Sequence, residues 1–126
     1  MKKKKPTEAE LQVLSILWNH GAQNVRFIND EISKQHDVGY TTTLKIMQIM
    51  TEKGFLTRDT SSKTHIYSAA VTEKSIKKNL LSSLVNTAFS GSTSSLVLHA
   101  LGNQKTTSEE LAAIKDYITK LENKSK

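Results

Sequence analysis

The change of hydrophobic spacing at Gly54 constrains the fold of this 126-residue chain more than any other feature of its sequence. Before it, apolar residues recur at helical intervals in three segments, residues 7–20, 25–35 and 41–53. After it, residues 55–58 and 64–67 are rich in β-prone side chains and flank a polar turn. Three helices followed by a β-hairpin is the order of a winged helix-turn-helix domain.

Local signals fix several of the expected helix ends. Thr7 and Glu10 have the spacing of a capping box, in which the hydroxyl and the carboxylate satisfy amides that the first turn leaves free. Gly54 is expected to end the third helix as a left-handed cap. In the second segment the apolar side chains face the core, and Asn29 is expected on the outer face with Arg26, Asp30 and Lys34.

The last third of the chain is helical again. We expect helices over residues 72–89, over the apolar segment 96–101, and from a second capping box at Thr107 to residue 123. Roughly 55 residues in three helices bury too little surface to fold alone. Packing against the first domain is one explanation, and a homodimer with a shared core is the explanation that we favour. The predicted fold is therefore mainly α with a small β-hairpin: a winged helix-turn-helix domain over residues 1–71 and a helical dimerisation domain over residues 72–126.

The third helix carries the most informative functional pattern. At about 100° per residue, Thr41, Lys45, Gln48 and Glu52 fall on one polar stripe. Lys45 can donate to O6 and N7 of guanine, and Gln48 can pair with N6 and N7 of adenine. Thr41 and Thr42 sit where the start of a helix can bind a phosphate. An ordinary amphipathic helix with a solvated face is the alternative, but the order of the elements favours a recognition helix.

Basic residues also occur on the hairpin and at the start of the chain. Arg58, Lys63 and His65 lie on or beside the hairpin, where cations suit contact with a nucleic-acid backbone, although a solvated turn is equally compatible. Residues 2–5 are all lysine and form either a basic arm or an irrelevant tail. The formal net charge of +6 agrees with a polyanionic partner.

Several classes of function find no support. The chain has no Cys, which excludes disulfides and Cys-ligated metals. Its four histidines lie in four different elements without ligand spacing, and its five glycines form no phosphate-binding loop. We therefore expect no catalysis, no metal and no cofactor. No export segment and no apolar run of about 18 residues is present, which predicts a soluble, cytoplasmic protein.

Several segments resemble the penicillinase-repressor (BlaI/MecI) family: residues 7–11 with Trp18, YTTTLKIMQIMTEKGFLTRD (40–59), HIYSAAV (65–71), SSLVLHAL and SEELAAIKDYI. The resemblance implies a homodimeric transcriptional repressor that binds a palindromic, double-stranded DNA operator and shuts off a resistance operon. It further implies inactivation when a membrane sensor-protease system causes cleavage in the dimerisation domain. No small-molecule ligand is evident from the sequence.

Residue by residue, the resemblance implies DNA contacts by Thr41, Thr42, Lys45 and Gln48, while Ile49 stands where the family often has Arg. The family's Asn-Phe scissile pair matches His99-Ala100. The implied dimer contacts are apolar residues of the last three helices: Leu80, Leu84, Phe89, Leu96, Val97, Leu101, Leu111, Ile114, Ile118 and Leu121. A winged-helix module that docks other proteins and a non-specific nucleic-acid binder are the alternatives.

Overall fold

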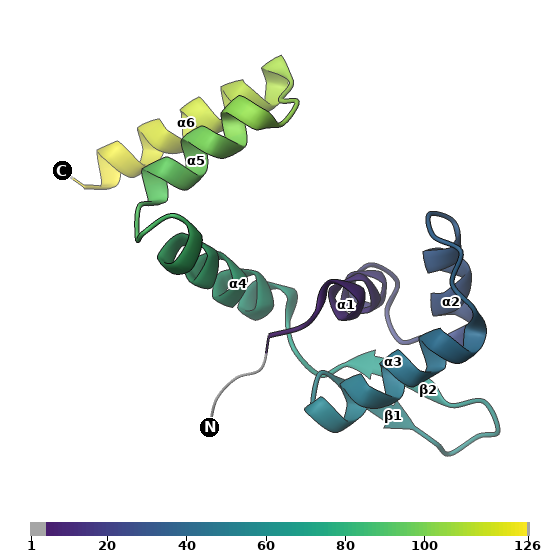
Figure 1. Ribbon diagram of the computed structural model, residues 1–126. Coiled ribbons are helices and arrows are strands. Elements are labelled where there is room, and N and C mark those ends of the chain that lie inside the picture. Colours follow the sequence, from purple (N-terminus) through teal and green to yellow (C-terminus); the bar gives the residue numbers. More distant parts are fainter. Residues whose placement is uncertain (1–4, 126) are drawn as a thin grey trace. The chain divides into compact units, whose positions relative to one another are not determined.

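The computed structural model describes residues 5–125, and its elements follow the predicted order (Figure 1). Over these residues they are α1 (Glu8–His20), α2 (Val25–Ser33), α3 (Tyr40–Lys53), β1 (Leu56–Asp59), β2 (Ile66–Ala69), α4 (Glu73–Ala88), α5 (Thr93–Asn103) and α6 (Ser108–Lys124). The expected fold, mainly α with a winged helix-turn-helix and a small hairpin, is confirmed. The described residues divide between Ser82 and Ser83 into two compact units.

The helix ends in the first unit follow from local chemistry. In α1 the Thr7 amide donates to Glu10 Oε1 at 2.8 Å and the Glu10 amide donates to Thr7 Oγ1 at 3.2 Å, which completes the predicted capping box. Gly54 ends α3 with φ +90°, a left-handed conformation that a residue without Cβ adopts freely. α2 ends at Ser33, before the expected residue 35.

The core of the first unit lies between α1, α2, α3 and the hairpin. Its buried apolar residues are Val13, Leu14, Leu17, Val25, Ile28, Ile32, Met47, Met50, Phe55, Leu56, Tyr67 and Ile76. The Trp18 side chain packs against this core and donates from Nε1 to the carbonyl of Val71 at 3.0 Å. Burial of this apolar surface is the main favourable contribution to folding of the unit.

A partly buried ion pair joins the start of α1 to the end of α3. Glu10 is buried, and its Oε2 accepts a hydrogen bond from Lys53 Nζ at 2.7 Å. Burial raises the pKa of the Glu10 carboxyl, but the hydrogen bonds and charge of Lys53 and the bonds to Thr7 outweigh burial. The pKa therefore lies below its ordinary value of 4.5.

The turn between α2 and α3 is held by Asn29, which corrects its expected position on the outer face. Asn29 is buried, and its Nδ2 donates to the carbonyl of Val38 at 2.8 Å and to Oγ1 of Thr43 at 2.9 Å. The carbonyl of the turn and the Thr43 hydroxyl need a donor where water is excluded, and Asn29 supplies it. These bonds fix the position of α3 relative to α2.

The hairpin is antiparallel, with Leu56 opposite Ala69 and Arg58 opposite Tyr67. Its strands begin later than the expected residues 55 and 64, and the connecting loop covers residues 60–65. Gln23 adds a short bridge, since its amide donates to the Tyr67 carbonyl at 3.0 Å and its carbonyl accepts from the Tyr67 amide at 2.8 Å. The segment before α2 is thereby tied to the hairpin.

The helix α4 crosses the division between the units. Its first part belongs to the first unit, because Ile76 is buried in the core and Leu80 packs against it. The Thr72 hydroxyl accepts from the Ser75 amide at 3.1 Å, which agrees with the expected start of this helix. The functional boundary between residues 71 and 72 stays a prediction.

In the second unit α6 runs back against the direction of α5 (Figure 1). α5 is longer than the expected 96–101, because Ser92 caps a helix that begins at Thr93. The capping box that opens α6 is confirmed by the bonds between Thr107 and Glu110, at 3.2 and 3.1 Å.

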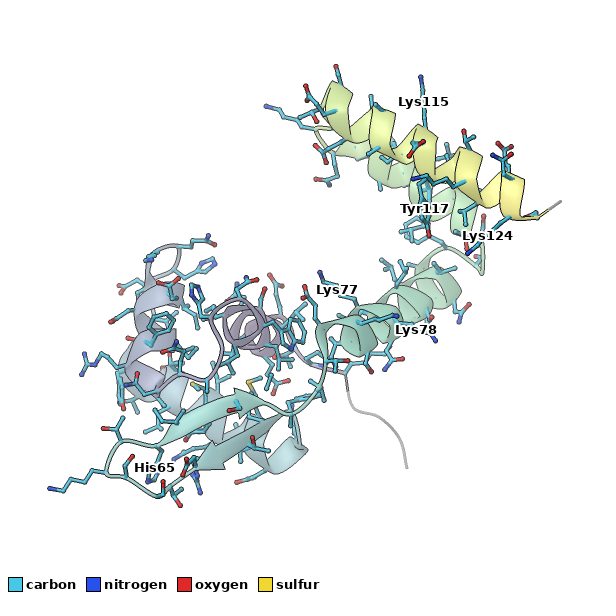
Figure 2. All side chains as sticks on the ribbon, turned by 180° about the vertical axis from the view of Figure 1, so that it is seen from behind. His65, Lys77, Lys78, Lys115, Tyr117 and Lys124 are labelled. Carbon is cyan, nitrogen blue, oxygen red and sulfur yellow. The ribbon has the colours of Figure 1, made fainter. Side chains whose placement is uncertain are left out.

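The second unit has no buried residue among those described from Ser83 onward. Leu98 on α5 is 68% exposed, and Tyr117 on α6, labelled in Figure 2, is 64% exposed. Both explanations for the apolar segment 96–101, packing against the first domain and a homodimer with a shared core, stay predictions. No helix in the described part of the chain has both the length and the apolar character needed to cross a membrane.

We predict that Lys53→Met lowers the free energy of unfolding of the first unit by about 1.5–3 kcal/mol at pH 7, because a buried carboxylate loses its charged partner. The folded pKa of Glu10 is depressed, so the stability from the pair is present above the ordinary value of 4.5 and is lost as pH falls through the folded pKa. Urea unfolding followed by fluorescence of Trp18, the one Trp of the chain, measures both effects.

Lys34→Met is the matched control. Lys34 pairs with Glu31 at 2.6 Å, but its side chain is 70% exposed. We therefore expect loss of this ion pair to lower the free energy of unfolding by less than about 1 kcal/mol. Equal destabilisation by the two substitutions, or a Lys53→Met effect that persists unchanged at pH 3, would contradict the role of the partly buried pair.

Candidate nucleic-acid interface

The helix α3 presents a polar outer face. Thr41, Thr42, Lys45 and Gln48 are all exposed, whereas Thr43, Met47 and Met50 on the other side are fully buried. Ile49 lies beside Gln48 and is 37% exposed. The core therefore fixes the rotation of α3 about its axis and leaves the predicted stripe open to solvent.

The start of α3 has no side-chain cap. Its cap residue is Gly39, which has no side-chain acceptor, whereas α1, α2, α5 and α6 are capped by Thr7, Asn24, Ser92 and Thr107. The first amides of a helix point outward and carry the positive end of its dipole. In α3 these amides belong to the turn that contains Thr41 and Thr42, where an anion can accept from them.

The loop of the hairpin, called the wing below, covers residues 60–65 and carries two of the predicted DNA-binding residues. Lys63 and His65 are exposed in this loop, and Figure 2 shows His65 close to the start of β2. The Asp59 carboxylate accepts from the Ser61 amide at 2.9 Å, which shapes the loop and lowers the pKa of Asp59. Arg58 is exposed on β1.

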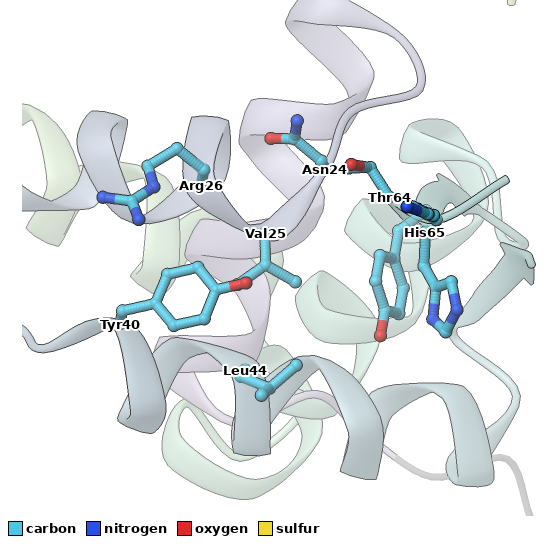
Figure 3. Close-up of a pocket in the computed structure, with 9 residues that line it drawn as sticks. Asn24, Val25, Arg26, Tyr40, Leu44, Thr64 and His65 are labelled. Carbon is cyan, nitrogen blue, oxygen red and sulfur yellow. The ribbon is translucent and has the colours of Figure 1, made fainter.

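A groove of about 340 Å³ lies between the start of α2, the first two turns of α3 and the wing (Figure 3). It brings Lys63 and His65 together with Asn24, Arg26 and Tyr40. Thr41, Thr42, Lys45, Gln48 and Arg58 do not line it.

Arg26 and Tyr40 line the groove and are not among the DNA-binding residues predicted from the sequence. The guanidinium carbon of Arg26 lies 5.1 Å from the centroid of the Tyr40 ring, within cation–π range. An exposed Arg beside the start of a helix is a weak sequence signal. Its proximity to the wing depends on the Gln23–Tyr67 bridge between distant segments.

Within residues 5–125, the cations of this face have no carboxylate partner. Among the described residues, ion pairs engage Lys34, Lys53, Lys77 and Lys120, with His20 near Glu31. No described carboxylate pairs with any of the cations on the outer faces of α2, α3 and the hairpin, which are Arg26, Lys45, Arg58 and Lys63. Their charge is therefore available to a polyanion.

Residues 2–4 of the basic arm lie outside the described residues. Within residues 5–125 no group of three or more His, Asp or Glu side chains is placed to hold a metal ion.

Comparisons with known proteins agree with this architecture. A profile of the family described as penicillinase repressor matches residues 6–120. The penicillinase repressor of Bacillus licheniformis is 25% identical to this chain over 120 residues, which cover 95% of this chain and 94% of that protein.

Two solution structures resemble part of this chain. The DNA-binding domain of the repressor BlaI is 26% identical, with a TM-score of 0.50, and the match covers 57% of this chain and 90% of that domain. The monomeric form of Bacillus licheniformis BlaI, in complex with the blaP half-operator, shares the fold at 23% identity and a TM-score of 0.50, over 58% of this chain and 89% of that one.

The family match spans nearly the whole chain, including the helices after the winged helix-turn-helix. On this basis the chain belongs to the penicillinase repressor family.

Proposed function

We propose that this protein is a homodimeric transcriptional repressor whose winged helix-turn-helix domain, residues 1–71, binds double-stranded operator DNA. The observation that carries the proposal is the outer face of α3. It combines an uncapped helix start with exposed Thr, Lys and Gln side chains, beside cations that have no carboxylate partner among the described residues. The relative whose structure contains a half-operator has the same fold, which supports DNA as the partner.

The side chains divide between reading bases and holding the backbone. Lys45 and Gln48 lie on the exposed face of α3, and their donors suit guanine and adenine edges in the major groove. Thr41 and Thr42 lie at the uncapped start of α3, and Arg58, Lys63 and His65 lie on the hairpin. These five residues hold phosphates and fix the register, which carries no sequence information by itself.

The last three helices, residues 72–126, hold two copies together in this proposal. The predicted contacts on α6, Leu111, Ile114, Ile118 and Leu121, recur at helical spacing and form one apolar face. Three of them are 42–48% exposed, and no described residue from Ser83 onward is buried. A second copy would cover this surface. A two-fold dimer then requires a palindromic operator with one half-site for each recognition helix.

Release of DNA follows from loss of the dimer. His99 and Ala100 lie within α5 and are exposed, so a cut between them divides the dimerisation helices without altering α3. Two tethered domains bind one site more tightly than a single domain, because the second contact forms at a high effective concentration. A membrane sensor-protease system would supply the cut, and relief of repression of a resistance operon would follow.

Lys45→Ala and Lys63→Ala should affect DNA binding in different ways. We expect Lys45→Ala to reduce preference for the operator by about 5- to 150-fold, equivalent to about 1–3 kcal/mol at the base that it reads. We expect Lys63→Ala to weaken binding to all sequences and to reduce the salt slope by about 1. Fluorescence anisotropy measures both, with the DNA upstream of the protein's own gene and with random DNA of equal length, over a salt series.

The binding measurements on Lys45→Ala and Lys63→Ala have a control variant and outcomes that would contradict the proposal. Lys34→Ala removes one charge from an ion-paired surface Lys and should change neither quantity. If wild type binds upstream and random DNA alike, the repressor proposal is wrong for that site. If both substitutions reduce binding to the two DNAs equally, the division between reading and holding is refuted.

Ile118→Asp should convert the dimer to a monomer, because a carboxylate would be buried in an apolar interface. Sedimentation equilibrium should give twice the 14.0 kDa chain mass for wild type and the single chain mass for the variant. Thr119→Asp adds the same charge on the adjacent, exposed position of α6 and should remain dimeric. A dimeric Ile118→Asp variant would place the interface elsewhere.

A chain that ends at Leu98 mimics cleavage. We expect its first unit to stay folded, with the Trp18 fluorescence of wild type, while the chain becomes monomeric and its operator affinity falls about 10²- to 10⁴-fold. Sedimentation and anisotropy on the same sample check this. A truncated chain that dimerises and holds the operator as tightly as wild type would rule out control through the dimer.

A further inference from the structure

We propose that the groove between α2, α3 and the wing is a seat for one phosphate of the DNA backbone, with Arg26 as its main anion-binding group and Tyr40 as the residue that positions Arg26. The inference rests on the proposed function, since it names a contact to the same DNA. It adds two residues from outside the recognition stripe, and one of them belongs to α2.

The guanidinium of Arg26 is available to an anion. Its side chain is exposed, and no described carboxylate pairs with it. The guanidinium lies over the Tyr40 ring, with 5.1 Å between the guanidinium carbon and the ring centroid. A stacked guanidinium keeps its N–H edges free for the two oxygens of a phosphate. Stacking also restricts a side chain that would otherwise lose conformational freedom on binding.

The residues that line the groove favour an anion. The described residues that line it include the cation Lys63 on the wing and no Asp or Glu. Figure 3 shows Tyr40 and Leu44 on α3, Val25 and Arg26 on α2, and Thr64 and His65 on the opposite side of the opening. The Asn24 side-chain oxygen already accepts from the Phe27 amide, and the Lys and Arg residues that line the groove are Arg26 and Lys63.

Backbone hydrogen bonds make the groove rigid. The two backbone hydrogen bonds between Gln23 and Tyr67, at 3.0 and 2.8 Å, hold the start of α2 beside the hairpin. Tyr67 is buried and lines the groove from the hairpin side. Arg26 and Lys63 therefore lie on walls that are joined by backbone bonds, and a phosphate can bind without rearrangement of the fold.

The start of α3 lies next to the groove, and both places suit an anion. Tyr40 is the first residue of α3, and the uncapped amides of the same turn attract an anion of their own. A DNA strand that passes the start of α3 therefore continues directly into the groove. An extended phosphodiester backbone can occupy both places together, which favours DNA over an isolated small anion.

The test measures Arg26→Ala with operator and random DNA by anisotropy over a salt series. We expect affinity to fall about tenfold on both DNAs, and the slope of log K against log salt to decrease by about 0.9. Lys34→Ala, at the other end of α2, removes the same charge from an ion-paired position and should leave the slope unchanged. The urea midpoint of Trp18 fluorescence should match wild type in each variant.

Tyr40 is tested through its dependence on Arg26. Tyr40→Ala should weaken binding in the wild-type background and have no further effect in the Arg26→Ala background, while Tyr40→Phe should bind like wild type. Additive losses would overturn the positioning role. Wild-type affinity for Arg26→Ala, with operator preference intact, would overturn the phosphate seat and leave the proposed function standing. Absence of operator preference in wild type would overturn the proposed function itself.

Discussion

The burial of one side of α3 is the constraint on which the rest of the structure depends. Met47 and Met50 are fully buried, the Thr43 hydroxyl is bonded by Asn29 at the beginning of the helix, and Lys53 is bonded by Glu10 at its end. These contacts leave α3 one orientation. The outer face of α3 contributes nothing to the core. Core packing therefore does not constrain which residues occupy it, and they can suit a ligand instead.

Much of the first unit could be predicted because its determinants are local. The capping box at Thr7, the left-handed Gly54 and the helical spacing before it act within a few residues, so the order of the elements and the exposure of Lys45 and Gln48 could be derived from the sequence. The start of α5 was missed because the Ser92 cap precedes the apolar segment.

The rest depends on contacts between distant segments. Asn29 is polar and was expected outside, but the turn carbonyl of Val38 and the hydroxyl of Thr43 require its donors inside. The groove that contains Arg26 and Tyr40 exists because Gln23 pairs with Tyr67, far along the chain. No spacing rule within one helix or strand contains this information, since each partner looks ordinary in its own segment.

The bare start of α3 has a consequence for the energetics of recognition. The other five helices of the described residues have a side-chain oxygen that accepts from an amide of the first turn, whereas Gly39 provides none. In a repressor that works as proposed, a phosphate oxygen of the DNA takes the place of the missing side-chain oxygen. It accepts hydrogen bonds from the free amides of the first turn and so caps α3. The first turn of α3 is then firmest when the operator is occupied, so recognition and local folding of the reading helix are a single thermodynamic event.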